Sequence, residues 1–248
     1  MTSEEMKKPE GSSAPAPTAV ETTPQLGDGC AAYAKAQCAT MTKCSPHTVS
    51  LKWIDCNAAL ERECKLLYGA PGSLVNAAWL HKCAAWSQTA TCDAFDREGG
   101  DCAPPHGQRE TGTGCVANSQ CASTYCKKTG RDCGTCVQKP TTSPPEPRGP
   151  LLGEKCTDSC DDRLHCDKGK CVAPKARIEG DSCTTDILGS SVGAQPCGAG
   201  LSCVGTDKPT CQKRPADGEA CTANGPRCYF PAACRDGTCK LPDPAACS

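Results

Sequence analysis

Cysteines are the residues of this sequence that could most readily do chemistry. The chain holds 26 of them among 248 residues. A thiolate can act as a nucleophile, a redox partner or a metal ligand, whereas a paired cysteine only cross-links the chain. A cysteine share above ~8–10% in an exported chain is typical of a disulfide scaffold. Because the count is even, complete pairing leaves no thiol for catalysis.

One cysteine pair has the spacing of a redox site. Cys133-Gly-Thr-Cys136 matches the C-x-x-C motif of thioredoxin-like oxidoreductases. That chemistry needs the first thiolate at the N-terminus of a helix, within a βαβ pattern. Here the motif lies in a glycine-rich stretch among other cysteines, and no βαβ pattern precedes it. We therefore interpret both cysteines as members of structural bridges.

Other catalytic and metal motifs are missing from the sequence. A structural zinc site needs paired C-x2-C units, or cysteines and histidines at ligand spacing. The C-x2-C spacing occurs once, and the four histidines are scattered, at His47, His81, His106 and His165. No Walker, Rossmann or G-x-S-x-G signature is present. We expect no catalytic residue, no metal site and no cofactor, and thus a protein that is not an enzyme.

The composition indicates that disulfides replace an apolar core. Leu, Ile, Val and Phe make up only about a tenth of the chain, too little to bury the apolar area that a core of this length requires. Disulfides persist in oxidising compartments, so we expect an extracytoplasmic protein, either secreted, at the cell surface or periplasmic.

The charge balance and the hydropathy limit the classes of partner that the chain could bind. Lys and Arg number 27 against 28 for Asp and Glu, a balance that argues against nucleic-acid binding. No apolar run is long enough for a membrane span or a secretory leader. We expect that a leader has been removed, and we allow membrane association only through a lipid anchor that has also been removed.

The N-terminal part divides into a tether and a helical domain. Residues 1–26 are rich in Ser, Pro, Ala and Thr and are expected to form a disordered tether. Residues 27–104 show helical periodicity and are expected to form a disulfide-stapled domain of three short helices. Their starts are expected at Asp28, Ser50 and Ser73, which are cap-forming residues.

Cysteine spacing predicts two bridges in this domain. The first two helices each carry C-x7-C, which places two thiols about two turns apart on one stripe. If the two helices are antiparallel, Cys38 faces Cys56 and Cys30 faces Cys64. We predict these two bridges.

The third helix is expected to return alongside the second. That path would bring either Cys83 or Cys92 close to Cys44, and the spacing does not choose between them.

After Cys102 the sequence becomes a series of small glycine-rich loops. We divide it into a first cysteine-rich module at 112–138, a Pro-rich linker at 139–150 and further modules at 151–248. A weak repeat begins at a glycine just before a cysteine, at Gly114, Gly153, Gly180 and Gly218. Each repeat ends in a cysteine-flanked turn containing glycine, as a short hairpin requires. Each module is therefore expected to be a two-stranded ribbon.

The borders of the modules can be drawn in two ways. Units that begin at the glycine hold 5, 4, 4 and 5 cysteines, so two of them cannot close internally. Units that begin at Cys160 all have even counts and end at Cys247, and we prefer this division. Cys156 would then bridge back to the first module across the linker, which is expected to be a semi-rigid polyproline-like spacer.

Aromatic residues suggest where a partner could bind. Trp53, Trp79 and Trp86 have helical spacing and are expected in the core of the helical domain. Tyr229 and Phe230 lie in a loop and are the candidate partner contacts. The alternative interpretation is that these two side chains cover the disulfides of their own module.

Two stretches of the chain, GCVANSQCASTYCKKTGRDCGTC and GEACTANGPRCYFPAACRDGTC, point to a family. They resemble the repeats of bacterial exported cysteine-rich proteins described as Dickkopf N-terminal cysteine-rich domain-like, a group of surface lipoproteins of gliding soil bacteria. In that group a cysteine-stapled helical region precedes the repeats. The resemblance implies export, often as a lipoprotein, and implies no activity.

We therefore predict a small disulfide-rich fold, with an N-terminal three-helix disulfide-stapled bundle followed by an elongated array of short cysteine-rich β-ribbon modules. The expected function is that of an exported or cell-surface, non-catalytic binding or scaffold protein, which presents disulfide-constrained loops to a protein or glycan partner. The alternatives are a secreted signalling-type ligand and a protease inhibitor, with an inhibitory loop at Lys208-Pro209 or from Arg227 to Pro231.

Overall fold

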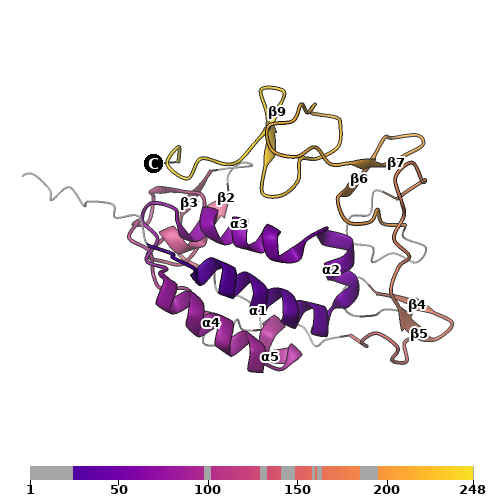
Figure 1. Cartoon of the computed structure of the whole chain (residues 1–248), viewed down its shortest axis with the longest axis horizontal. Coiled ribbons are helices and arrows are strands. Elements are labelled where there is room, and N and C mark those ends of the chain that lie inside the picture. Colours follow the sequence, from indigo (N-terminus) through magenta and orange to yellow (C-terminus); the bar gives the residue numbers. More distant parts are fainter. Residues whose placement is uncertain are drawn as a thin grey trace, which may run out of the picture.

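The computed structural model describes residues 25–97, 102–128, 133–140, 149–157, 160, 164–184 and 195–247. This part of the chain forms an N-terminal helical domain and four small antiparallel sheets (Figure 1). Almost all of the expected tether, and residues 141–148 of the expected linker, lie outside the described residues.

Within its described residues, the helical domain contains five α-helices where the periodicity predicted three. They are α1 (Gly29–Cys44), α2 (Pro46–Lys52), α3 (Cys56–Tyr68), α4 (Ala77–Thr89) and α5 (Cys92–Arg97). The expected second helix began at Ser50 and so joined the end of α2 to α3, and α5 was not expected. The helix α2 has no buried residue.

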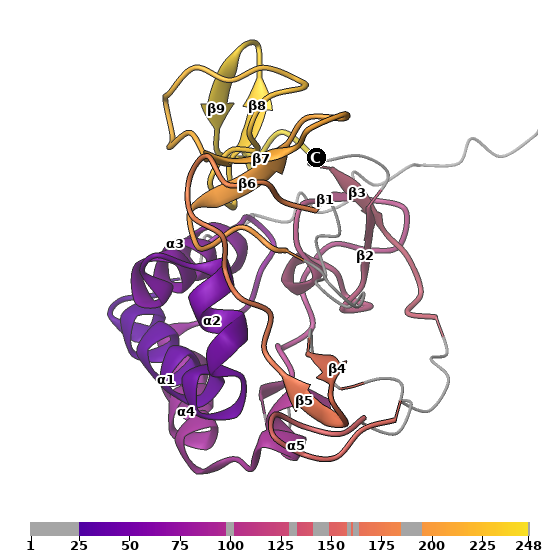
Figure 2. The ribbon, with the colours of Figure 1, turned by 90° about the vertical axis from the view of Figure 1, so that its right-hand side faces the viewer.

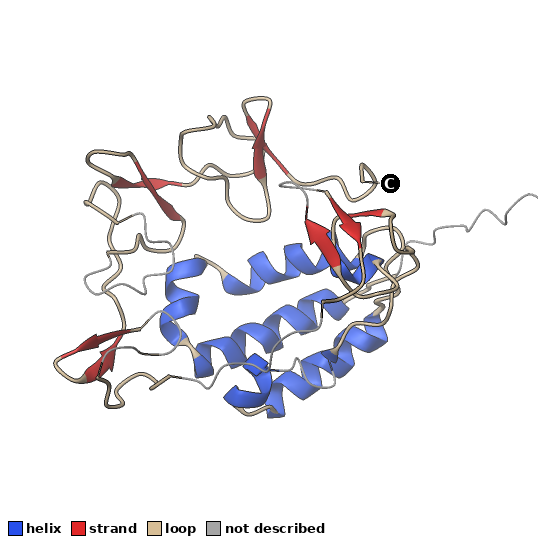
Figure 3. Ribbon diagram, turned by 180° about the vertical axis from the view of Figure 1, so that it is seen from behind, coloured by secondary structure: helices blue, strands red, loops and turns tan. Residues whose placement is uncertain are grey.

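The helix α1 lies between α3 and α4 (Figures 1 and 3). The third predicted helix therefore packs along the first and not along the second. Small buried side chains explain this contact, since Ala34 and Ala36 of α1 are 1% exposed and let α4 approach closely. Thr40 of α1 then donates a hydrogen bond to the carbonyl oxygen of Ser87 in α4, at 2.8 Å.

Two helix starts differ from the expected ones. Asp55 caps α3 by accepting a hydrogen bond from the backbone N–H of Ala58, at 3.0 Å. Asn76 caps α4 in the same way through the N–H of Trp79. Ser50 lies within α2 and Ser73 precedes α4 in a buried turn. Several cap-forming residues stand close together here, and tertiary packing selects among them.

Four disulfides staple the helical domain. The structure contains both predicted bridges, Cys30–Cys64 and Cys38–Cys56. The cysteine that pairs with Cys44 is Cys92, one of the two expected candidates. Cys83 pairs instead with Cys102, just beyond the helices.

The core of this domain is small and partly aromatic. Leu80 and Val75 are fully buried beside the Cys30–Cys64 bridge. Tyr33, Tyr68 and Trp79 pack around them, and the Tyr68 and Trp79 rings meet edge to face with centroids 5.5 Å apart. All three tryptophans were expected in this core. Trp53 is buried, at 7% exposed. Trp79 and Trp86 are only half-buried, and the Trp86 ring stacks on the ring of Phe95.

A carboxyl group beside these rings makes the stability of the domain depend on pH. Burial raises the pKa of Glu63 above its ordinary value of 4.5, and the charge of Lys52 offsets part of this effect. The folded chain therefore holds the Glu63 proton more tightly than the unfolded chain does. This contribution to stability is complete below the ordinary pKa and is lost as the pH rises through the raised pKa.

Replacing Glu63 should remove that dependence. We expect Glu63→Gln to be more stable than the wild type at neutral pH, with the difference shrinking as the pH falls toward 4.5. Guanidinium unfolding at a series of pH values measures this effect. The control Glu61→Gln keeps the Glu63 carboxyl and should retain the pH dependence. An unchanged pH dependence in Glu63→Gln would show that another group causes it.

The described strands belong to four modules, of which modules 2, 3 and 4 are the expected two-stranded ribbons and module 1 has a third strand. Module 1 contains β1 (Gly114–Cys115), β2 (Cys126–Lys128) and β3 (Gly134–Cys136) in the order β1-β3-β2. Modules 2, 3 and 4 contain the hairpins β4 (His165–Asp167) with β5 (Lys170–Val172), β6 (Leu201–Val204) with β7 (Thr210–Lys213), and β8 (Ala233–Arg235) with β9 (Thr238–Lys240).

Each module contains two internal disulfides that share one pattern. The first of its four internally paired cysteines bonds to the third, and the second bonds to the fourth. In module 2, for example, Cys156 bonds to Cys166 and Cys160 bonds to Cys171. The third and fourth cysteines stand opposite each other across the hairpin in every module. Each hairpin is therefore clamped to the loop that precedes it by two crossed bridges.

A repeated turn opens every module. Its four residues are 110–113, 151–154, 178–181 and 216–219, and its third residue is a glycine with φ between 80° and 95°. A positive φ at this position is what a type II turn requires. In each case this glycine donates a hydrogen bond to the carbonyl oxygen of the fourth cysteine at 2.8 Å. In module 1 the repeat thus begins at Gly112, two residues before the position expected from the sequence.

The disulfides agree with modules that begin at the glycine. The preferred division, with units that begin at Cys160, is wrong. Cys156 bonds within module 2 and does not cross the linker. The two modules with an odd count each have one cysteine left over, and these two cysteines, Cys133 and Cys247, bond to each other. The even-count argument failed because it allowed no bridge between distant modules.

The Cys133–Cys247 bridge closes the array that was expected to be elongated. Its two cysteines are 114 residues apart in sequence. The modules follow one another around the helical domain from β4 and β5 to β8 and β9, and the chain end returns beside β3 (Figures 1 and 2). Modules 1 and 4 are thus the joined ends of a ring.

Module 1 is docked on the helical domain through a buried amide. The Gln120 side chain is fully buried, and its oxygen accepts hydrogen bonds from the N–H groups of Val116 and Ala117, at 2.7 and 3.1 Å. Its amide nitrogen donates to the carbonyl oxygen of Pro71. Val116 and Ala117 in turn pack against Ala70, which lies in the segment between α3 and α4.

Candidate interaction site

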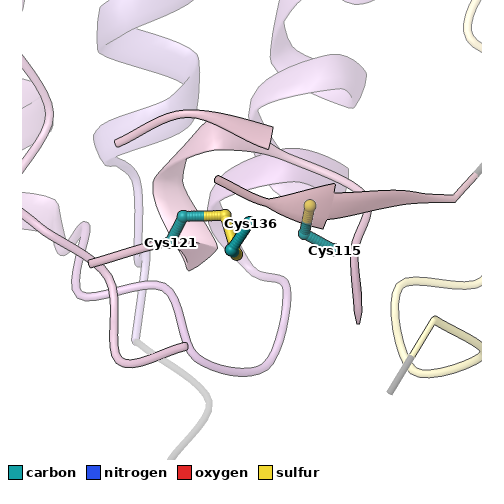
Figure 4. A group of neighbouring side chains, drawn as sticks. All are labelled: Cys115, Cys121 and Cys136. Carbon is teal, nitrogen blue, oxygen red and sulfur yellow. A yellow bond between two sulfur atoms is a disulfide. The ribbon is translucent and has the colours of Figure 1, made fainter. Parts of the chain in front are cut away.

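The atoms of the structure that could in principle hold a metal ion gather in clusters of cysteine sulfurs, one in each module. In each module three sulfur atoms lie within 4.8 Å of one another, as Cys115, Cys121 and Cys136 do in module 1 (Figure 4). Cys121 and Cys136 bond to each other, and Cys115 bonds to Cys126. A metal ion binds the thiolate form of cysteine, so these clusters in their bonded form are cross-links and not metal ligands.

The C-x-x-C motif is split between two different bridges. Cys133 bonds to Cys247 and Cys136 bonds to Cys121. Its two sulfurs therefore do not form the reversible dithiol pair on which a thioredoxin-like reaction depends. Every cysteine of the chain lies within the described residues, and none of them is free.

The predicted contact residue Tyr229 lies at the junction between module 4 and the helical domain. Its hydroxyl oxygen accepts a hydrogen bond from the backbone N–H of Ile54, at 2.9 Å. Its own backbone N–H donates to the carbonyl oxygen of Pro215. Tyr229 is half-buried and joins module 4 to the helical domain, while the neighbouring Phe230 is 49% exposed, and their role as partner contacts stays a prediction.

Ile54 is the apolar residue that the helical domain contributes to this junction. It lies between α2 and α3 and is 73% exposed, although Trp53 beside it is buried. Module 3 approaches it through Gly200, which has a φ of 76°. A Cβ atom on Gly200 would lie 2.4 Å from the Ile54 side chain. The helical domain, module 3 and module 4 therefore meet at Ile54.

Two arginines belong to the same junction. Arg214 is half-buried, and its Nε donates a hydrogen bond to the carbonyl oxygen of Leu201, at 2.9 Å. Burial lowers the pKa of Arg214, and the positive charge of the nearby Arg227 lowers it further, whereas Tyr229 raises it. The backbone supports this placement, because Arg214 donates its N–H to the carbonyl oxygen of Gly200 and the next residue, Pro215, accepts the N–H of Tyr229. Arg227 precedes Tyr229 by two residues, so both arginines belong to the segments that meet at Tyr229.

We call Ile54, Arg214, Arg227, Tyr229 and Phe230 the junction site. The sequence identified Tyr229 and Phe230 as contact candidates and Arg227 as part of an inhibitory loop. It missed Ile54 and Arg214, because the contacts that gather these residues span up to 175 positions. No local pattern carries that information.

A second surface feature is a shallow, open groove along α3. Ala58, Glu61, Arg62, Lys65 and Leu66 line it from the helix, and Leu241 lines it from the segment after β9. Arg62 also forms an ion pair with Asp217 in the opening turn of module 4. This turn therefore serves as a docking element for the helical domain.

The equivalent turns of modules 2 and 3 expose apolar side chains. Leu151 and Leu152 are 40% and 50% exposed, and Ile178 is 71% exposed. In both modules the acidic fourth residue of the turn holds the loop by accepting a hydrogen bond from the N–H of the first residue. These apolar side chains are thus presented on fixed loops.

Comparisons with known proteins give no relative. No family model, no curated protein and no solved structure matches this chain. The resemblance to Dickkopf-like repeats stays a prediction. Within the ranges that the structure describes, no helix has the length and apolar character needed to cross a membrane.

Proposed function

We propose that this protein is an exported or cell-surface, non-catalytic binding or scaffold protein that presents disulfide-constrained loops to a protein or glycan partner. Its disulfides are those of a protein from an oxidising environment. The proposal extends to attachment by a lipid anchor, as the resemblance to Dickkopf-like lipoproteins implies.

One observation carries the proposal. Rigid loops of this protein hold apolar side chains in solvent, among them Phe230 and Ile54 at the junction site. An exposed apolar side chain on a loop fixed by disulfides loses little conformational freedom on binding, which favours affinity. Aromatic anchors of this kind commonly contribute most to a protein interface.

A capture experiment with matched variants tests the proposed function. The intact oxidised protein is immobilised and exposed both to a surface extract of its source organism and to a glycan array. We expect a partner whose capture falls at least tenfold for Phe230→Ser combined with Ile54→Ser. The control is Lys127→Ser, which removes an exposed side chain on β2 in module 1.

The same experiment can contradict the proposal. If the oxidised protein captures nothing beyond what its reduced and alkylated form captures, the folded loops do not bind a partner. Inhibition of a protease that is lost in Arg227→Ala or Lys208→Ala would instead support the protease-inhibitor alternative.

A further inference from the structure

The junction site carries positive charge without a counter-ion. Among the ion pairs and hydrogen bonds of the described residues, no carboxylate pairs with Arg214 or Arg227. Two neighbouring guanidinium groups repel each other, and a half-buried one is only partly compensated by water. An arrangement of this kind gains stability when an anion binds between or beside the two groups.

Apolar surface lies next to this charge. Phe230 directly follows Tyr229, and Ile54 donates its backbone N–H to the Tyr229 hydroxyl. The exposed fractions of these two side chains, 49% and 73%, leave most of the Ile54 surface and half of the Phe230 surface in water. Covering them would contribute roughly 25 cal/mol for each Å² of apolar area.

Covalent and steric constraints hold the site in one shape. Module 4 is clamped by the Cys221–Cys234 and Cys228–Cys239 bridges. Gly200 leaves just enough room for the Ile54 side chain. A partner therefore meets charged and apolar groups at fixed positions, and its binding requires little ordering of this protein.

We propose that the junction site binds an acidic peptide segment of a partner protein, with a carboxylate placed on Arg214 and Arg227 and an apolar side chain placed on Ile54 and Phe230. An arginine pair suits carboxylates through bidentate hydrogen bonds. An aliphatic surface such as Ile54 needs an apolar group, which a peptide side chain supplies. An anionic glycan would engage the arginines but would leave Ile54 uncovered, so the peptide fits the site better.

This inference rests on the proposed binding function and is tested with defined probes. A random displayed-peptide library is selected on the intact oxidised protein, and the enriched peptides are synthesised. We expect peptides that combine Asp or Glu with a Leu, Ile or Phe nearby. Their affinity should fall at least tenfold in Arg227→Glu and in Phe230→Ser, and also when salt is raised from about 50 to 500 mM.

Two matched controls separate the site from the rest of the surface. Lys127→Glu introduces the same change of charge on β2 in module 1 and should leave the affinity unchanged. Replacing Asp and Glu by Asn and Gln in the selected peptide should abolish its dependence on Arg227. Peptide mapping of the bridges in each variant confirms that the disulfides have formed.

Any of the following outcomes would overturn the inference. Enriched peptides without acidic residues, or acidic peptides insensitive to Arg227→Glu, would place peptide binding elsewhere and leave the general binding function standing. Binding of a sulfated oligosaccharide that depends on Arg227 but not on Phe230, without any acidic peptide, would identify an anionic glycan as the ligand. Selection of no peptide at all would show that the site does not bind peptide segments.

Discussion

A single backbone cut in the linker at residues 141–148 should leave the wild-type protein in one piece on a non-reducing gel. The same cut should separate a Cys133→Ser/Cys247→Ser variant into two pieces. The reason is the connectivity of the bridges, because Cys133–Cys247 is the bridge that joins the part before the linker to the part after it. The twelve other bridges close within one part or the other.

The experiment requires a specific protease sequence inserted into the linker and one gel run with and without reductant. A matched control is Cys156→Ser/Cys166→Ser, which removes a bridge with a separation of only 10 residues. This control should stay in one piece after the cut. Two pieces from the wild type under non-reducing conditions would contradict the ring.

Opening the ring should also lower the stability of the docked modules. A bridge over a long loop typically contributes ~2–4 kcal/mol by restricting the unfolded chain. Module 4 would keep its Arg62–Asp217 ion pair and the Ile54–Tyr229 hydrogen bond, which are exposed and contribute little. Hydrogen exchange should therefore rise at the junction site and remain unchanged inside the modules, whose own bridges persist.

The second large effect is expected at Gln120. Gln120→Met keeps a similar volume but leaves two buried N–H groups and one carbonyl oxygen without their partner. Each unsatisfied buried group costs roughly 1–3 kcal/mol, so we expect a loss of about 3–5 kcal/mol in the free energy of unfolding. Guanidinium unfolding measures this loss, and hydrogen exchange at the Val116 and Ala117 amides locates it.

The control for this variant is Gln212→Met in β7. Gln212 is half-buried, and its amide makes only a long contact of 3.5 Å to Thr210. We expect a change within about 0.5 kcal/mol for this substitution. Equal losses in the two variants would mean that the buried amide of Gln120 does not hold module 1 on the helical domain.

Local features of the fold could be predicted from the sequence, and long-range ones could not. Two C-x7-C spacings on helices were enough to predict Cys30–Cys64 and Cys38–Cys56, because helix geometry places these thiols on one stripe. Glycine-containing turns between cysteines were enough to predict the hairpins. The Cys133–Cys247 bridge lay beyond such reasoning, since no periodicity relates its two cysteines.

The candidate site was likewise predictable only in its local part. Tyr229 and Phe230 could be singled out as adjacent aromatic residues in the loop between Cys228 and Cys234. Ile54 and Arg214 became visible only when the fold brought them to Tyr229 from the helical domain and from module 3. A site assembled from three parts of the chain leaves no motif in any one of them.

The ring also constrains how the molecule can be made. During synthesis Cys133 is added to the chain long before its partner Cys247. The thiol of Cys133 therefore stays unpaired while its neighbours Cys121, Cys126 and Cys136 form their own bridges. During that interval it can be captured by the wrong sulfur. We expect correct maturation to depend on thiol-exchange catalysis, and the proportion of correctly joined rings, more than helix or hairpin formation, to limit the yield of native protein.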